Sequence, residues 1–94
     1  MQTVYLGKET VQTIADVHTL FAEGFGFPEW YGRNLDALYD CLTDLTEPSL
    51  VIIADAEILR DRLGERYDAL RMLLDDAHEN PNVRVREFPS PALV

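Results

Sequence analysis

The sequence predicts an α/β fold in which a three-stranded parallel sheet is packed with about four helices. Three short apolar runs, near residues 4–6, 50–54 and 83–86, have the length and composition of strands. Each of the two stretches between them contains two segments with apolar residues at helical spacing. Because helical crossovers join consecutive strands in the same direction, the strands are expected to be parallel.

The first third of the chain is expected to form a strand and a helix. Val4-Tyr5-Leu6 is a short apolar run. Thr13 can cap the next helix, and Asp16 three residues later gives a weaker form of the capping box. Gly24 and Gly26 would end that helix. The side chains expected to face inward are Ile14, Val17, Leu20 and Phe21.

A second, short helix with two chemically different sides is predicted to follow, beginning near Gly32 or Asn34 and ending before Pro48. One stripe of this helix is apolar: Leu35, Leu38, Cys41, Leu42 and Leu45. The opposite side is polar: Asp36, Asp40, Thr43 and Asp44. Cys41 is the only cysteine, so it cannot form an internal disulfide, and its stripe suggests a small core residue.

The second strand is predicted at Leu50-Val51-Ile52-Ile53-Ala54, an unbroken apolar run. Such a run is typical of a strand that is covered on both faces. Asp55 is expected to cap a short helix directly after it. This helix would bury three side chains and would end at Gly64: Ile58, Leu59 and Leu63.

A longer helix and an edge strand are predicted to complete the fold. The helix would run from about Glu65 to Glu79 and end before Asn80-Pro81. Its inward-facing residues are expected to be Leu70, Leu73, Leu74 and Ala77. Val83-Arg84-Val85-Arg86 alternates apolar and basic residues, which predicts a half-exposed edge strand.

The length and charge of the chain limit both its organisation and its partners. A chain of 94 residues fits a single domain over 1–94, with an irregular tail at 89–94. Its formal net charge is −9, from 17 acidic and 8 basic residues. This balance argues against direct binding to nucleic acid or an anionic membrane and favours a basic partner.

The N-terminal sequence has no basic segment followed by a long apolar run, so no signal peptide is expected. No stretch approaches 18 apolar residues, so no membrane span is expected. Together with the single cysteine, these features suggest a protein of the reducing cytoplasm.

The acidic side of the second helix is the strongest candidate for a functional site. Asp36 and Asp40 are four residues apart, so they lie roughly 5–6 Å from each other and repel. Asp44 continues the row, and three aromatic residues adjoin it: Trp30, Tyr31 and Tyr39. Exposed aromatics beside charges suggest a binding surface, although a solvated acidic face would show the same charge spacing. A second acidic pair is predicted on the last helix: Asp75 and Glu79.

Catalysis is the less favoured alternative. Asp36 and Asp40 could serve as acid and base in a small hydrolase, but nothing indicates a cleft that would separate their proton affinities. His18 is expected on the flank of the first helix and His78 near the end of the last, and neither has metal-ligand spacing to another His or Cys. The sequence therefore predicts neither an enzyme nor a metal site or cofactor.

The segment PEWYGRNLDALYDCLTD closely resembles the barstar family, which are intracellular inhibitors of barnase-type ribonucleases. The order of elements also matches over nearly the whole chain. This resemblance implies a barstar-like single layer, with a three-stranded parallel sheet and about four helices. It also implies that the acidic helix and the loop before it block the basic active-site cleft of a secreted ribonuclease.

The resemblance carries individual roles to matching positions. Asp40 would occupy the position of a substrate phosphate, and Asp36 would meet a further arginine. The other residues expected to contact the partner are Trp30, Tyr31, Gly32, Arg33, Asn34, Tyr39, Thr43, Asp44, Asp75 and Glu79. The implied partner is one basic ribonuclease bound by an inhibitor that is a monomer when free. An adaptor or immunity module for another basic protein or toxin stays open.

Five positions depart from the family pattern. Trp30 stands where the resemblance implies a tyrosine, and Tyr39 where it implies a tryptophan. Arg33 is a base where the resemblance implies an acid, Asp44 replaces a glycine, and Leu45 replaces a tryptophan. These changes suggest a different partner, and Arg33 suggests that a cognate enzyme carries an acid opposite it.

Overall fold

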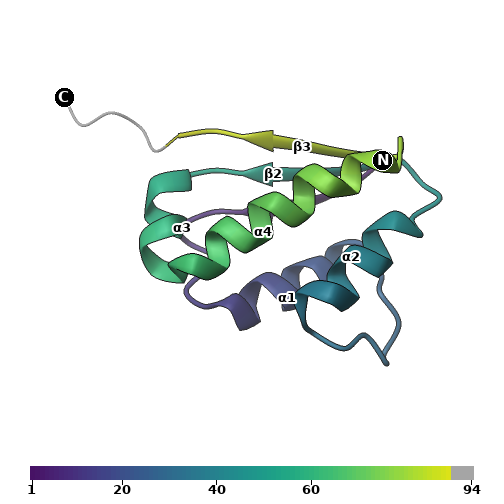
Figure 1. The fold of residues 1–94 in the computed structure, drawn as a ribbon, viewed down its shortest axis with the longest axis horizontal. Helices are drawn as coiled ribbons and strands as arrows, with labels where there is room; N and C mark the ends of the chain where they lie inside the picture. The colour runs from purple at the N-terminus through teal and green to yellow at the C-terminus, as the bar shows by residue number, and fades with distance from the viewer. Residues whose placement is uncertain (90–94) are drawn as a thin grey trace.

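The computed structural model describes residues 1–89, and within them it has three strands, four α-helices and one 3-10 turn (Figure 1). The elements are, in order, β1 (Gln2–Leu6), α1 (Ile14–Gly24), α2 (Leu35–Thr43), β2 (Ser49–Ile53), α3 (Ala56–Leu63), α4 (Glu65–Asp76), the 3-10 turn η1 (Ala77–Glu79) and β3 (Val83–Glu87). The predicted order of strands and helices is therefore confirmed.

The sheet has the order β1-β2-β3, and both strand pairs are parallel, as predicted. Val4 pairs with Val51, and Val51 pairs with Val85, so one row of valines crosses the sheet on its inner face. The strand alternation places these side chains toward the helices. β3 is an edge strand, again as predicted.

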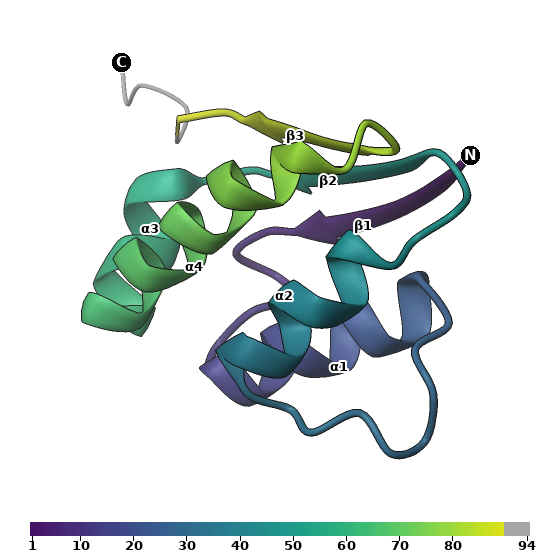
Figure 2. The same ribbon diagram turned by 45° about the vertical axis from the view of Figure 1, so that its right-hand side comes forward.

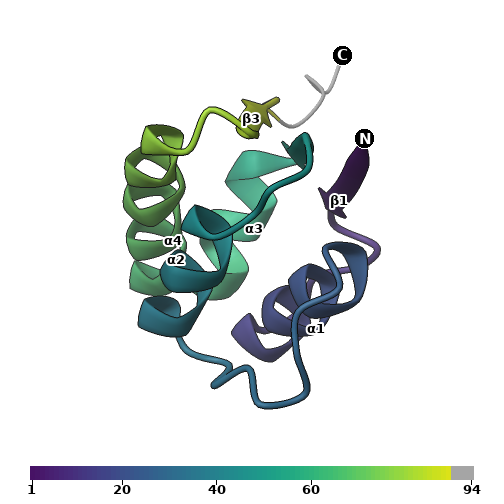
Figure 3. The same cartoon turned by 90° about the vertical axis from the view of Figure 1, so that its right-hand side faces the viewer.

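The helices cover only one face of this sheet, which Figure 3 shows with the strands seen nearly end-on. In β2, Val51 and Ile53 are buried, whereas Leu50 and Ile52 on the outer face are only half-buried. The prediction that this strand is covered on both faces was therefore wrong. An unbroken apolar run also suits a central strand whose outer face is partly shielded by its neighbours: Thr3, Tyr5, Arg84 and Arg86.

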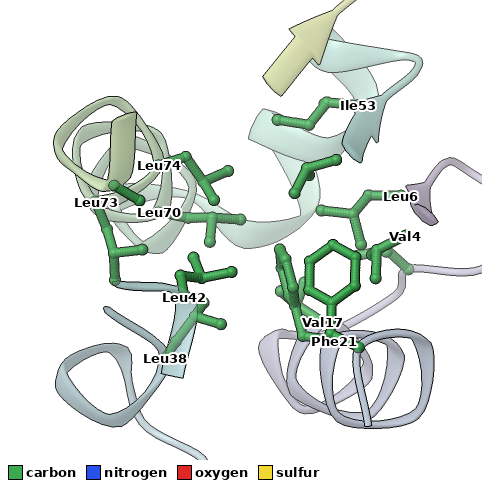
Figure 4. Close-up of a cluster of buried hydrophobic side chains, with 14 of the residues drawn as sticks. Val4, Leu6, Val17, Phe21, Leu38, Leu42, Ile53, Leu70, Leu73 and Leu74 are labelled. Atoms are coloured by element: carbon green, nitrogen blue, oxygen red, sulfur yellow. The ribbon is translucent and has the colours of Figure 1, made fainter. Parts of the chain in front are cut away.

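The hydrophobic core lies between the inner face of the sheet and the four α-helices (Figure 4). Buried members drawn in Figure 4 come from β1, α1, α2, β2 and α4: Val4, Leu6, Val17, Phe21, Leu38, Leu42, Ile53, Leu70 and Leu74. α3 adds Leu59. α2 packs on α4, and α1 packs on β1. The apolar stripe of α2 therefore faces the core, and its acidic side faces outward.

Side-chain caps were predicted at the starts of α1 and α3, and the structure has the first but not the second. At α1, the Asp16 carboxylate accepts hydrogen bonds from the backbone N–H groups of Gln12 and Thr13, at 2.8 and 3.1 Å. These bonds lower the pKa of Asp16 and match the predicted capping motif. At α3, Asp55 holds the cap position in a left-handed conformation, with φ 56°. Its carboxylate accepts from the backbone of Lys8 instead of capping α3, so the predicted cap was wrong.

Asn80 fixes the end of α2 against the turn that follows α4. The side chain is buried, and its amide nitrogen donates to the carbonyl oxygens of Leu42, Thr43 and Leu45, at 2.9, 3.2 and 2.9 Å. The last carbonyl groups of a helix have no partner within the helix. A residue predicted only to stop one helix therefore also completes the end of another.

The irregular tail predicted for residues 89–94 falls outside the described residues, apart from Pro89. Within residues 1–89, the structure has no helix with the length and hydropathy needed to span a membrane.

Candidate partner-binding site

The carboxylates on the acidic side of α2 are open to solvent and have no partner among residues 1–89. Asn34 caps the helix, because its side-chain oxygen accepts from the backbone N–H of Ala37 at 2.8 Å. Asp36, Asp40 and Asp44 are all exposed. In the described part of the chain, none of their carboxylates takes part in a hydrogen bond or an ion pair. Their charges are therefore available to an outside partner.

A groove of about 620 Å³ runs between α2 and α4 beside this row. Its floor is largely apolar, with contributions from Leu35, Tyr39, Ala69 and Leu73. Three carboxylates stand around it, from Asp36, Asp40 and Asp76, and no basic residue lines it. The groove thus suits a long side chain with an apolar stem and a positive end.

Met72 and Asp76 are members of this groove that the sequence analysis missed. Met72 is 69% exposed, and Asp76 is exposed as well. Ala69, Met72, Leu73 and Asp76 follow one another at i, i+3, i+4 and i+7, which is the spacing of a helix stripe. This stripe adjoins the inward-facing one, and only the packing of α4 against α2 shows that it borders a site.

The two acids predicted on the last helix are already engaged within the chain. Asp75 forms an ion pair with Arg71 at 3.1 Å. Glu79 accepts a hydrogen bond from the hydroxyl of Tyr39, which joins η1 to α2. This bond raises the pKa of Tyr39. The structure therefore brings Glu79 to α2, whereas Asp75 is bound along its own helix. Both acids have less freedom than the acids of α2.

The loop between α1 and α2 presents one aromatic side chain and buries another. Figure 2 shows this loop below the two helices that it connects. Trp30 is 82% exposed, whereas Tyr31 is only 7% exposed. The expectation that both aromatics lie on the surface was thus right for Trp30 and wrong for Tyr31. Tyr39 is half-buried against the core.

Tyr31 is buried because it anchors the loop to α1. Its hydroxyl lies 2.6 Å from Nδ1 of His18, and its ring packs on Phe27 with centroids 5.0 Å apart. Burial raises the pKa of Tyr31 to about 12. His18 is 4% exposed, so the predicted position on a helix flank does not describe it. Its burial, followed by the nearby charge of Arg33, lowers the pKa of His18.

Arg33 is exposed at the end of the loop, but its guanidinium is bound to α1. Nη2 donates to the carbonyl oxygen of Ala15 at 3.0 Å and to Oγ1 of Thr19 at 2.7 Å. Arg33 also has a positive φ of 54°, just before the cap residue Asn34. Gly32 beside it is exposed.

The far end of α2 contributes two less exposed side chains. Thr43 is half-buried, and its hydroxyl donates to the carbonyl oxygen of Tyr39 at 3.0 Å. Cys41 is half-buried instead of fully in the core, and it borders a cavity of about 270 Å³ together with Trp30, Phe27 and Asp44. Burial raises the pKa of the Cys41 thiol, which disfavours a reactive thiolate.

No group of His, Cys, Asp and Glu side chains in residues 1–89 is arranged to hold a metal ion. The two histidines lie on different elements, α1 and η1. His18 is buried against Tyr31, and His78 is exposed on η1. The exposed carboxylates beside an apolar groove suit recognition of a positively charged partner.

Comparisons with known proteins agree with this picture. Residues 1–89 match the family described as Barstar (barnase inhibitor). The chain is also 30% identical over 80 residues to "Putative ribonuclease inhibitor YrdF" of Bacillus subtilis (strain 168). That similarity covers 84% of this chain and 88% of the relative. Because the family match spans almost the whole chain, this protein belongs to the barstar family of barnase inhibitors.

Proposed function

We propose that this protein inhibits a basic, barnase-type ribonuclease by covering its active-site cleft with the acidic face of α2 and the loop before it. The observation that carries the proposal is the row of exposed carboxylates without partners in the described chain. Members of the barstar family are inhibitors and not enzymes, so the alternative of a small hydrolase is set aside. Inhibition by blockade needs no cofactor.

Asp40 is the proposed centre of the contact. It stands on the middle turn of α2, with Asp36 one turn before it and Asp44 one turn after it. A cleft that binds RNA phosphates is basic, and carboxylates can make charge-assisted hydrogen bonds to the same donors. Asp36 and Asp44 would then meet bases to either side of the central pair.

The loop would add apolar area and shape to these charges. Trp30 is the one large aromatic side chain of the loop that is almost fully exposed, and burial of such a ring is often a main source of binding energy. Gly32 and Asn34 are exposed between it and the helix, so their backbone can approach a partner closely. Tyr31 supports this surface from beneath, because its ring and hydroxyl are turned into the protein.

The α4 side is proposed as the periphery of the interface. Tyr39, Asp75 and Glu79 lie there, together with Met72 and Asp76 of the groove. Thr43 contributes from the end of α2. Because Asp75 and Glu79 already have partners within the chain, their contribution to binding should be smaller than that of Asp36 or Asp40.

The proposal takes residues 1–94 as one inhibitory domain that is monomeric when free and binds one ribonuclease in the cytoplasm. The acidic face would also attract a basic protein that is not a ribonuclease. An adaptor or immunity module for such a protein is therefore the alternative function.

The test is a titration of this protein into a barnase-type ribonuclease during RNA cleavage, at low and high salt. We expect inhibition to be complete at one equivalent and association to slow as salt rises. At the same inhibitor and ribonuclease concentrations that give complete inhibition with the unchanged protein, Asp40→Ala should not inhibit. If the unchanged protein fails to inhibit even at low salt, the ribonuclease proposal is wrong, and binding to other basic toxins becomes the question.

A further inference from the structure

We propose that Arg33 is a positioning residue, which fastens the loop of residues 25–34 to α1 and thereby sets how Trp30 is presented. This assignment replaces the expectation that Arg33 meets an acid on the partner. Its consequence for binding rests on the proposed function, whereas its consequence for the free protein does not.

The contacts of Arg33 are within the chain. One nitrogen of the guanidinium donates both to the carbonyl oxygen of Ala15 and to the hydroxyl of Thr19. The two acceptors are four residues apart on α1, so they lie on the same side of that helix. A side chain bonded to both is held at one place on α1.

The second anchor of the loop falls between these two acceptors. His18, which meets the Tyr31 hydroxyl, lies three residues after Ala15 and directly before Thr19. Tyr31 and Arg33 are themselves two residues apart, and both reach the same helix. One anchor is buried and the other exposed, so together they fix the end of the loop at two points. The nearby positive charge also lowers the pKa of His18, which agrees with this placement.

The backbone at Arg33 gives a further reason to look for a role of its side chain. Its φ of 54° lies in the left-handed region, where glycine or asparagine is the usual residue. Arg33 therefore makes the turn into the α2 cap at a conformational disadvantage. The two hydrogen bonds to α1 offset this disadvantage.

Removing the charge of Arg33 distinguishes its two possible roles in binding, which are anchoring the loop and contacting an acid on the enzyme. It is the only base between residues 29 and 47, on a surface that would face a basic cleft. If Arg33 contacts no acid on the enzyme, its removal should leave the association rate unchanged or raise it. If it contacts an acid, its removal should slow association.

The first experiment uses the free protein and Trp30, the only tryptophan of the chain. Time-resolved fluorescence anisotropy of Trp30 would be compared in the unchanged protein, Arg33→Gln, Thr19→Val and the double variant. Valine has nearly the shape of threonine, so Thr19→Val leaves Arg33 and its charge in place. It removes only the hydroxyl that accepts from Arg33. We expect each single variant to increase the fast loss of anisotropy, and the double variant to add little to Arg33→Gln.

Two further variants act as controls. Arg84→Gln removes the same charge from the outer face of the sheet and should leave the anisotropy of Trp30 unchanged. Arg33→Lys keeps the charge with a smaller set of donors and should restore part of the anchoring. In an NMR titration, Arg33→Gln should raise the pKa of His18, and Arg84→Gln should not.

The second experiment measures association and dissociation with a basic ribonuclease. Arg33→Gln and Thr19→Val should both speed dissociation, by about two- to tenfold for the loss of hydrogen bonds of this kind. Thr19→Val should leave association unchanged. The proposal is overturned if Arg33→Gln slows association and speeds dissociation while Thr19→Val changes neither rate. Arg33 would then belong to the contact surface.

The anisotropy experiment on the free protein tests the role of Arg33 independently of the proposed function. If the unchanged protein inhibits no ribonuclease, the anisotropy of Trp30 still decides whether Arg33 anchors the loop. If neither Arg33→Gln nor Thr19→Val changes that anisotropy while thermal unfolding stays cooperative, the positioning role is wrong.

Discussion

The acids of α2 and the acids at the end of α4 make an instructive comparison. Both sets are spaced four residues apart. One set lies on α2; the other, Asp75 at the end of α4 and Glu79 in η1, is called the α4 acids, and α4 and η1 both pack against α2. On α2, Asp36, Asp40 and Asp44 have no partner in the described chain. At the end of α4, Asp75 pairs with Arg71, and Glu79 accepts from Tyr39. Two sets of acids with the same spacing in the sequence thus differ in the fold: the carboxylates of α2 are free to bind a partner, and those of Asp75 and Glu79 are already bound.

The difference has a physical cause. An exposed carboxylate without a partner keeps its full hydration and its repulsion from neighbours, so it adds little to the stability of the free protein. A carboxylate that bonds to its own chain contributes to stability and must be released or shared to bind a partner. The α2 row should therefore act in binding, and the α4 acids should act mainly in holding the fold.

The largest expected effect is that of Asp40→Ala on binding. Truncating one member of a desolvated charge pair costs about 2–5 kcal/mol, an estimate to which the barnase–barstar pair itself contributes. This corresponds to about 30- to 4,000-fold in Kd. Free-protein stability should be unchanged or rise by about a few tenths of a kcal/mol, because one repulsion is removed.

Affinity for a barnase-type ribonuclease and urea denaturation check both parts of that expectation. Asp61→Ala on α3 is the matched control, since it removes the same charge from an exposed position away from α2. A large loss of stability in Asp40→Ala would show that Asp40 has a structural role, and the contrast with α4 would then fail.

A second expected effect concerns the contact that holds α2 to η1. Asn80→Ala removes an amide that bonds to three carbonyl groups of the chain around the end of α2. Leaving such buried groups unsatisfied costs about 1–3 kcal/mol of unfolding free energy. Urea denaturation measures this, with Asn82→Ala as a milder control that removes a single side-chain donor to Leu45. Equal losses in the two variants would contradict the importance given to Asn80.

A smaller effect should appear as a pH dependence of stability centred on His18. Because burial lowers the pKa of His18 in the folded protein, the unfolded chain takes up a proton first as pH falls. The free energy of unfolding should therefore decrease below about pH 6.5, the ordinary value for histidine, and level off below the folded pKa. Above that range His18 stays neutral in both states.

Chemical denaturation between pH 5 and 8 tests this dependence. His18→Gln should flatten the profile below about pH 6.5, the ordinary value for histidine, and His78→Gln on η1 serves as the matched control. If the His78 variant loses the dependence instead, the buried pair with Tyr31 is not its source.

The smallest expected effect is that of the α4 acids on affinity. Asp75→Asn and Glu79→Gln should each change the binding free energy by about 0–1 kcal/mol, as is usual for exposed charges. The same affinity assay used for Asp40→Ala measures this. A loss as large as that of Asp40→Ala would show that a partner displaces the internal contacts, and the two regions would then be equivalent in binding.

The sequence by itself determined the order of elements, the parallel sheet and the two sides of α2. These features depend on periodicity, on capping residues such as Thr13 and Asn34, and on helix-ending glycines, which act over a few residues. The long recognition segment before and within α2 also indicated the family, which the match over residues 1–89 confirms.

Only the tertiary structure decided which polar groups are free and which are occupied. Local sequence could not show that Tyr31 turns inward to His18, that Arg33 bonds to α1, or that Asp55 bonds to Lys8 instead of capping α3. Nor could it show that Met72 and Asp76 border the groove beside α2. Each of these contacts joins residues at least 13 positions apart, so it depends on how the helices pack and not on the spacing within any one of them.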